Sequence, residues 1–166
     1  MLKLPSLLKP KQKAKDIYSI NFDELKKLGI TNLILDVDET LLPRRSLDIS
    51  PKLFEWVATR KEEGFKLCLT SNSRQPIRVQ YIGKTLTLPY IFFGLKPLPF
   101  AFWQAMKILE SQPANTAMIG DQLFMDILGA NFLGIYSIFT KLITPETFLP
   151  RQWMRQVEDW LLGRLQ

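Results

Sequence analysis

The sequence predicts an α/β fold: one three-layer α/β/α domain whose helices cover both faces of a central parallel sheet of about five strands. Its 166 residues fit one domain. Short apolar runs alternate with helical segments, which is typical of parallel strands buried on both faces. Hydrophobic residues make up 46% of the chain, enough for one core. No apolar run approaches the roughly 18 residues of a membrane-spanning helix.

Helix caps and turn residues locate the first elements. We expect a short helix that begins after Asn21 and ends near Gly29. The first strand follows at residues 32–36. Ser50 and Pro51 suit the start of a helix that runs to about residue 63. Further strands are expected at residues 65–70, 89–93, 116–120 and 135–140, and further helices at residues 76–83, 99–111 and 122–133.

The two ends of the chain differ from the middle. Residues 1–20 form a basic arm, residues 21–145 the α/β domain, and residues 146–166 a C-terminal amphipathic helix that belongs to the same domain. The chain has a net charge of +6, to which the arm contributes strongly. Residues 1–16 are either a solvated, partly ordered terminus or a contact with an anionic membrane surface. Prolines and lysines interrupt any signal-peptide core, and nucleic acid is not expected because no aromatic residues lie between the lysines.

The helix expected at residues 150–165 also has two interpretations. Trp153, Val157, Trp160 and Leu161 recur at helical spacing on one face. That face either docks on the core or lies in a membrane interface, where tryptophan is favoured. The expected location is cytoplasmic, with peripheral contact at the inner membrane face, and the sequence does not predict an oligomeric state.

Composition restricts the chemistry. The chain has no histidine and one cysteine. These counts exclude a Ser/His triad, a phosphohistidine mechanism, His-ligated zinc and a disulfide framework. Cys68 lies within an expected strand and is interpreted as inert packing. Any catalysis must therefore come from carboxylates, lysines and hydroxyls, with or without a hard metal ion.

Polar residues follow four of the expected strands. Asp36, Asp38 and Thr40 come after the first strand, and Ser71 with Asn72 after the second. The later groups are Lys96-Pro97 and Gly120-Asp121, with Asp126 five residues further on. One such aspartate would be an ordinary turn residue. Because parallel strands open their carboxyl ends to the same crevice, the four groups in succession predict a site.

The chemistry of this set is coherent. Converging carboxylates stay ionised together when a hard cation such as Mg²⁺ lies between them. A lysine adds a second positive charge that stabilises a transferring phosphoryl group. One carboxylate can attack phosphorus, and a second acid can protonate the leaving oxygen.

These residues resemble the four motifs of the haloacid dehalogenase (HAD) superfamily, a group with Rossmann-like domains. The matching segments are DVDETLL, TSN, LKP and GDQLFMD. The resemblance implies that Asp36 is the nucleophile and Asp38 the general acid/base. It further implies that Thr40 steadies the loop, that Ser71 binds phosphoryl oxygens, and that Lys96 neutralises Asp36 and the phosphate.

The same resemblance implies the metal ligands. Asp36, the backbone carbonyl of Asp38, and Asp121 would hold Mg²⁺, and Asp126 would act behind them or through water. Asn72 joins Ser71 and Lys96 as a substrate-binding residue. Glu39 stands where many relatives carry glycine and is interpreted as a solvated loop residue.

The short connections between the motifs leave no room for an inserted cap domain. The chain thus resembles the capless subclass IIIA and, through GDQLFMDILGAN, the phosphatidylglycerophosphate phosphatase family with its bacterial YqeG-type members. That resemblance implies phosphatidylglycerophosphate as the substrate. Arg44 and Arg45 either clamp a second phosphate or belong to the solvated surface. Two alternatives stay open: a phosphatase for a soluble or polymeric phosphate (nucleotide, sugar, protein or polynucleotide), and a binding module without turnover.

Overall fold

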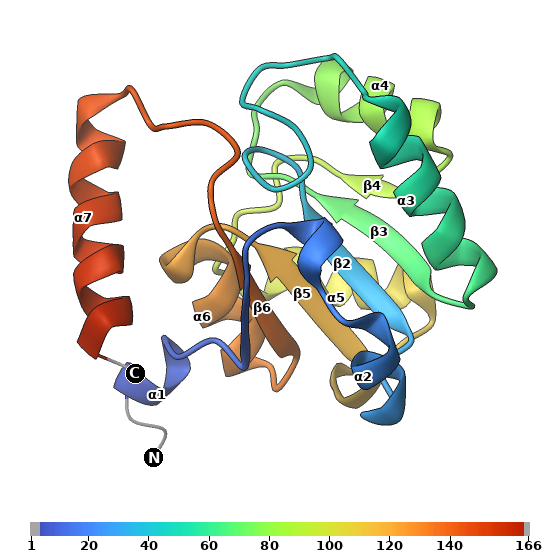
Figure 1. Ribbon diagram of the computed structural model, residues 1–166, viewed down its shortest axis with the longest axis horizontal. Coiled ribbons are helices and arrows are strands. Elements are labelled where there is room, and N and C mark those ends of the chain that lie inside the picture. Colours follow the sequence, from blue (N-terminus) through green and yellow to red (C-terminus); the bar gives the residue numbers. More distant parts are fainter. Residues whose placement is uncertain (1–3, 165–166) are drawn as a thin grey trace.

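The computed structural model describes residues 4–164, and Figure 1 shows their arrangement. Six parallel strands form one sheet in the order β1-β6-β5-β2-β3-β4. The strands are β1 (Gln12–Ala14), β2 (Asn32–Asp36), β3 (Lys66–Thr70), β4 (Tyr90–Ile91), β5 (Thr116–Gly120) and β6 (Tyr136–Thr140). The α-helices are α1 (Leu4–Leu7), α2 (Phe22–Lys27), α3 (Pro51–Glu62), α4 (Pro76–Leu86), α5 (Pro99–Leu109), α6 (Leu128–Phe132) and α7 (Leu149–Arg164). Short helical turns occupy η1 (Ile17–Ser19), η2 (Pro113–Asn115) and the π-helical η3 (Leu123–Ile127).

Helices cover both faces of this sheet, which confirms the three-layer prediction (Figure 1). Strand β2 shows why, because all five of its residues are buried and neighbours point to opposite faces. Leu33 and Leu35 pack with the α2, α3 and α4 layer. Ile34 packs with Phe102 and the α5 and α6 layer. The chain therefore needs unbroken apolar runs in its central strands.

Two helix starts are confirmed in detail. The Ser50 hydroxyl accepts a hydrogen bond from the Leu53 N–H (3.2 Å), with Pro51 in the first turn of α3. The Asn21 side chain accepts one from the Glu24 N–H (3.2 Å) at the start of α2. Each cap satisfies a backbone donor that the first turn leaves free.

The sheet has one strand more than the five expected, because part of the basic arm pairs with it. Gln12 and Ala14 of β1 lie in parallel register with Ile138 and Thr140 of β6. The Asn131 amide holds the preceding turn by donating to the Leu7 carbonyl (2.7 Å) and to the Lys9 carbonyl (2.9 Å). Asn131 belongs to the GAN triplet of the sequence, so this motif attaches the arm. Residues 1–3 lie outside the described part of the chain.

Removing the Asn131 amide should loosen this attachment. We expect Asn131→Ala to lower the free energy of unfolding by about 1–3 kcal/mol, because two backbone carbonyls and the Ser137 hydroxyl lose their partner. Urea denaturation of the two proteins measures the change. Gln104→Ala, on the exposed side of α5, is the control. Equal midpoints for Asn131→Ala and wild type would show that the arm does not depend on this side chain.

Helix α7 docks on the domain with a different face from the one expected. Glu158 is buried and accepts a hydrogen bond from the Phe124 N–H of η3 (3.2 Å). Leu162 packs with Leu8 and Ile127, while Trp153 is 70% exposed. Of the two interpretations of the tryptophan face, docking holds only in part, because Trp153 and Trp160 are exposed while Leu161 packs against the Leu162 cluster. Paired charges can face a domain when each has a partner there, and a hydrophobic stripe alone does not reveal this. Residues 165–166 of the expected helix lie outside the described residues.

Two further expectations concern single features. Cys68 is completely buried in β3, and burial raises the pKa of its thiol to about 12, in agreement with inert packing. Within residues 4–164, none of the helices is both long and apolar enough to cross a membrane.

Candidate active site

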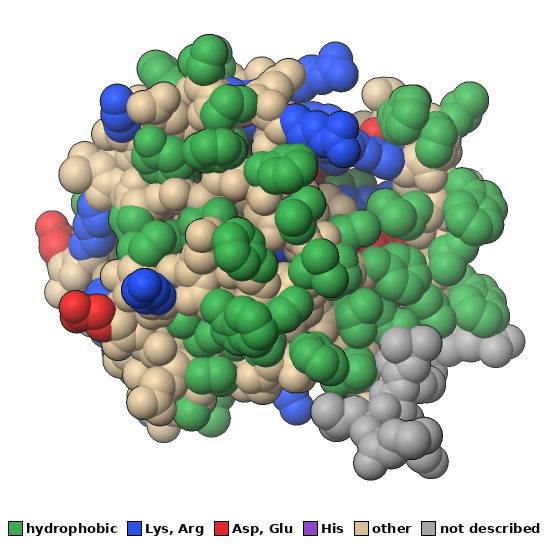
Figure 2. All heavy atoms as spheres, turned by 180° about the vertical axis from the view of Figure 1, so that it is seen from behind, with side chains coloured by type: hydrophobic (Ala, Val, Ile, Leu, Met, Phe, Trp, Pro, Cys, Tyr) green, Lys and Arg blue, Asp and Glu red, His purple; other side chains and the backbone are tan. Residues whose placement is uncertain are grey.

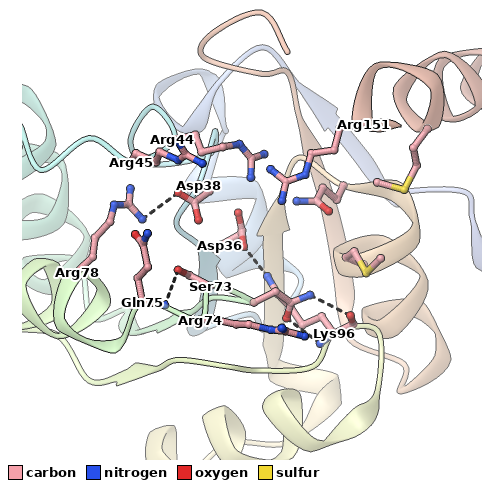
Figure 3. Close-up of a pocket in the computed structure, with 14 residues that line it drawn as sticks. Asp36, Asp38, Arg44, Arg45, Ser73, Arg74, Gln75, Arg78, Lys96 and Arg151 are labelled. Carbon is pink, nitrogen blue, oxygen red and sulfur yellow. Dashed lines mark hydrogen bonds and ion pairs between the residues drawn. The ribbon is translucent and has the colours of Figure 1, made fainter. Parts of the chain in front are cut away.

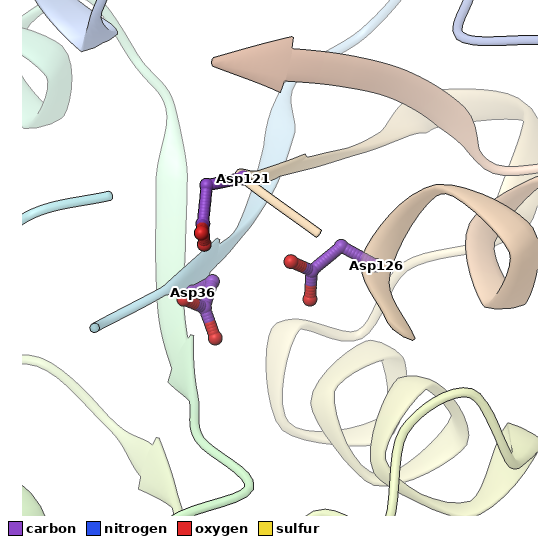
Figure 4. Close-up of side chains that lie close together, drawn as sticks. All are labelled: Asp36, Asp121 and Asp126. Atoms are coloured by element: carbon purple, nitrogen blue, oxygen red, sulfur yellow. The ribbon is translucent and has the colours of Figure 1, made fainter. Parts of the chain in front are cut away.

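Three aspartates meet at the carboxyl edge of the sheet (Figure 4). Asp36 ends β2, Asp121 directly follows β5, and Asp126 lies on η3. All three are buried, and one carboxylate oxygen from each lies within 4.8 Å of the others. The structure thus brings together the Asp36, Asp121 and Asp126 side chains of the predicted metal site, for which Asp38 was expected to supply only its backbone carbonyl.

Lys96 supplies the nearest positive charge. Its Nζ lies 2.5 Å from an Asp36 oxygen and 2.6 Å from an Asp126 oxygen. Burial by itself would lower the pKa of Lys96, but the carboxylates of Asp126 and Asp36 outweigh it and raise the pKa. The lysine is therefore charged, as its expected role requires.

One lysine does not neutralise three buried carboxylates. Burial raises the pKa of Asp36 well above its usual value, and Asp126 and Asp121 add to this against the opposing effect of Lys96. Burial also raises the pKa of Asp121 to about 6, although Arg155 opposes the rise. The second Asp36 oxygen, Oδ2, is buried and has no hydrogen-bond partner. An all-oxygen site with an unpartnered carboxylate oxygen fits a hard divalent cation.

The raised pKa of Asp121 gives a pH prediction. A buried acid whose pKa is raised by folding destabilises the metal-free protein as pH rises through about 6, and a cation removes that penalty only from the ionised form. We expect Mg²⁺ to raise the melting temperature at about pH 7.5, and to raise it much less at about pH 5. Thermal denaturation with Mg²⁺, and with K⁺ at equal ionic strength as the control, measures this. An equal rise at both pH values would contradict the prediction.

Asp126 lies on η3, which is a π-helix followed by α6 rather than the start of the single helix expected at residues 122–133. Its carboxylate also accepts a hydrogen bond from the Gln122 N–H (3.1 Å). Gly120 leaves room for it, because a Cβ at this position would collide with the Asp126 carboxylate. Single π-helical turns of this kind are frequent at functional sites.

Asp38 has a partner that the sequence did not reveal. Arg78 on α4 is buried, and its guanidinium lies 2.9 Å from an Asp38 oxygen. Arg78 also donates to the Ser46 carbonyl (3.1 Å), so it joins the loop after β2 to α4. Thr40 donates to Asp121 (3.2 Å), consistent with its expected role in steadying this loop.

Ser71 and Asn72 make different contacts in the site. The Ser71 hydroxyl oxygen accepts a hydrogen bond from the Ser73 N–H (3.0 Å), which leaves its proton available to a phosphoryl oxygen. The Asn72 side chain accepts from the Lys96 N–H (2.8 Å) and donates to the Lys96 carbonyl (3.0 Å). Asn72 therefore positions Lys96, a role that the sequence did not suggest beside its expected contact with substrate.

Glu39 is not the solvated residue that was expected. It is buried, and its carboxylate accepts from the Arg44 N–H and from the Thr144 N–H, both at 2.8 Å. Its φ of 64° places it in the left-handed region, which favours glycine. Two backbone donors offset this strain, and the carboxylate ties the catalytic loop to the segment before α7.

A cavity of about 460 Å³ opens above Asp36 and Asp38 (Figure 3). Lys96, Arg44 and Arg45 are among the residues that line it. The other lining residues are Asn72, Ser73, Arg74, Gln75, Arg78, Gln122, Met125, Arg151 and Met154.

Helix α7 adds two arginines to the site that sequence reasoning missed. Arg155 donates to the carboxylate and the backbone carbonyl of Asp121. Arg151 reaches the cavity one turn earlier (Figure 3). Arg151 and Arg155 are four residues apart and so lie on the same face of α7. Glu158 is buried and Asp159 is exposed, so the face toward the domain is charged. Only the folded structure shows that this face points to the active site.

The fold and this geometry agree with known proteins. A family described as HAD-hydrolase-like matches residues 95–141. "Probable phosphatase YqeG" of Bacillus subtilis is 31% identical over 156 residues, which cover 94% of this chain and 90% of that protein.

Two solved structures have a similar fold. An uncharacterized protein from Listeria monocytogenes is 18% identical, with a TM-score of 0.57, over 80% of this chain and 97% of that one. The cobalt-bound deoxy-D-mannose-octulosonate 8-phosphate phosphatase of Haemophilus influenzae is 17% identical, with a TM-score of 0.54, over 82% of this chain and 90% of that one.

The connections from β2 to β3 and from β3 to β4 each contain one helix and no inserted cap domain. Together with the four motifs at one sheet edge and the extended match to a phosphatase, this settles the family. The chain belongs to the haloacid dehalogenase superfamily, as a capless phosphatase that resembles YqeG and has an acidic triad able to hold a divalent metal.

Proposed function

We propose that the protein hydrolyses a phosphomonoester through an aspartyl-phosphate on Asp36, with Mg²⁺ as its cation, and that its substrate is phosphatidylglycerophosphate. The observation that carries the chemistry is the buried contact of Asp36 with Lys96, beneath a cavity that Asp38 also lines. Asp36, Asp121 and the backbone carbonyl of Asp38 would hold the cation, with Asp126 behind them. The bound cation would add positive charge beside the phosphoryl oxygens.

The two carboxylates of the catalytic loop divide the reaction. An Asp36 oxygen forms a bond to phosphorus as the bond from phosphorus to the ester oxygen breaks, and Asp38 gives its proton to the departing alcohol. In the second half, Asp38 takes a proton from water, whose oxygen attacks phosphorus and releases Asp36 and inorganic phosphate. Lys96 and Ser71 stabilise the charge on the phosphoryl oxygens in both halves.

Support for a lipid substrate comes from exposed apolar side chains on or next to the segments that also carry cavity-lining residues. Phe148, Leu149 and Trp153 are exposed on the α7 side, and Phe93 and Leu95 on the loop that carries Lys96. Figure 2 shows the face over α5 and α6, where hydrophobic side chains are widespread and Lys and Arg side chains gather at one edge. Exposed aromatic and basic residues together suit the interface of an anionic membrane. We propose peripheral contact there, through residues 1–16 and 150–165 as well as these exposed side chains.

The test offers phosphatidylglycerophosphate in mixed micelles and p-nitrophenyl phosphate in solution to the purified protein with Mg²⁺. Phosphate release is measured, with Asp36→Asn as the blank. We expect kcat/KM to be much higher for the lipid. Turnover of p-nitrophenyl phosphate alone would contradict the lipid substrate and leave the phosphatase chemistry in place. No release from either ester would contradict the proposed reaction.

A further inference from the structure

Arginines are more numerous around the catalytic cavity than its carboxylates require. Each acidic side chain of the site already has a cationic partner, although Asp36 and Asp126 share one. Lys96 pairs with Asp36 and Asp126, Arg78 with Asp38, and Arg155 with Asp121. Arg44, Arg45 and Arg151 also line the cavity, and we call these three residues the arginine cluster. The cluster is thus a surplus of positive charge in a site that binds anions.

The arginine cluster is poorly neutralised by the protein. Arg44 lies 3.4 Å from Glu146, but no described carboxylate forms an ion pair with Arg45 or Arg151. Burial lowers the pKa of Arg151, and the nearby Arg44 lowers it further, against Glu146 and Asp38. Arg44 and Arg151 are both partly buried and repel each other, and an anion bound between them would relieve this repulsion.

The position of the arginine cluster shows where that anion would sit. The same three residues line a second cavity, of about 780 Å³, which Asp36 does not line. Phe148 lies on its walls together with two carboxylates that already have partners. Glu39 accepts from the Arg44 and Thr144 N–H groups, and Glu146 pairs with Arg44. Arg44 and Arg45 come from the catalytic loop, and Arg151 comes from α7 on the opposite side (Figure 3). The cluster therefore stands between the reacting phosphate and a second space for substrate.

From this placement we infer that Arg44, Arg45 and Arg151 form a second anion subsite, which selects phosphomonoesters that carry another phosphate group and whose remaining part occupies the second cavity. Guanidinium groups bind phosphate oxygens in pairs, and this holds for a phosphodiester and for a second monoester alike. The inference rests on the proposed phosphomonoester hydrolysis. It deepens that function by stating which substrates the site prefers and which residues select them.

Four esters, used as substrates, distinguish the effect of the second phosphate group on activity from the effect of the lipid chains. Phosphatidylglycerophosphate and phosphatidic acid are lipids with and without a second phosphate group. Glycerol 1,3-bisphosphate and glycerol 3-phosphate are their soluble counterparts. The measured quantity is the ratio of kcat/KM between the ester with the second phosphate and the ester without it, within each pair.

We expect Arg151→Ala and Arg45→Ala each to lower this ratio about tenfold or more, which is the effect of losing a hydrogen bond to a charged group. Arg74→Ala is the matched control, because Arg74 lines the catalytic cavity but not the second one. Its ratio should stay near that of wild type. If the kcat/KM ratio falls only in the lipid pair, the subsite recognises a lipid headgroup. If the ratio falls in both pairs, the subsite recognises bisphosphates in general. Unchanged ratios in both cluster variants, or an equal fall in Arg74→Ala, would overturn the subsite.

A binding measurement tests the subsite independently of whether the protein hydrolyses the esters. Calorimetry on Asp36→Asn with Mg²⁺ compares glycerol 1,3-bisphosphate with glycerol 3-phosphate, without and with Arg151→Ala. We expect the bisphosphate to bind about tenfold more tightly, and Arg151→Ala to remove this advantage. Equal affinities would overturn the subsite even if wild type hydrolyses all four esters. If wild type hydrolyses none of them, the proposed reaction fails while calorimetry still decides the subsite.

Discussion

Asp36→Asn is expected to abolish phosphate release, with kcat reduced on the order of 10³-fold or more, as for other enzymes that lose their nucleophile. An amide cannot form the acyl phosphate, and Asp36 is the carboxylate that Lys96 contacts at 2.5 Å beneath the cavity. The folded state should tolerate the change. Burial raises the pKa of Asp36, so a neutral side chain of the same shape removes an unfavourable buried charge.

Two measurements test this result together. Phosphate release with Mg²⁺ gives the loss of turnover, and thermal denaturation without Mg²⁺ should give a melting temperature no lower than that of wild type. Asp23→Asn, an exposed aspartate in the first turn of α2, is the control for the same chemical change. Residual turnover above a few per cent of wild type would remove Asp36 from the nucleophile's role. A large loss of stability would show that its charge holds the fold.

Lys96→Met is expected to damage both activity and folding. Methionine keeps the length of the side chain, but it leaves the carboxylates of Asp36 and Asp126 buried without their cation. Removing one partner from a buried ion pair lowers the free energy of unfolding by about 3–5 kcal/mol. The rate should also fall by about 10²–10³-fold, because a charge that stabilises the transition state is lost. Urea denaturation and phosphate release measure the two effects, with Lys107→Met on the exposed side of α5 as the control.

A double variant separates the two roles of Lys96. In the double variant Lys96→Met with Asp126→Asn, one of the two carboxylates left without a cation becomes neutral. Part of the lost free energy of unfolding should therefore return. Activity should not return, because the positive charge beside Asp36 is still missing. Recovery of turnover along with stability would show that Lys96 acts only by holding the fold.

Local chemistry explains which parts of the fold were predictable. Ser50 and Pro51 start α3 through interactions inside one turn, and the apolar run of β2 needs burial on both faces wherever it lies. Strand β1 has no such signal, because it has three residues and pairs with a strand more than a hundred positions away. Its attachment depends on Asn131, whose partners only the folded chain brings near.

The same distinction applies to the site. The aspartates, Ser71 and Lys96 follow strand ends, so the topology of a parallel sheet alone brings them together. Arg78 and Arg155 lie on helices, and each meets its aspartate across a distance in sequence that no pattern encodes. Glu39 was wrongly interpreted because a charged residue in a loop is usually exposed. Here two backbone N–H groups hold it inside, and one of them comes from Thr144.

The contact between Glu39 and Thr144 has a consequence for the evolution of this fold. Glycine at position 39 would relieve the left-handed backbone, but it would leave the N–H groups of Arg44 and Thr144 without their acceptor. The Thr144 hydroxyl, which donates to the same carboxylate at 2.8 Å, would also lose its acceptor. Positions 39 and 144 should therefore covary among homologues, so that lineages with glycine at the first position show no preference for a hydroxyl at the second.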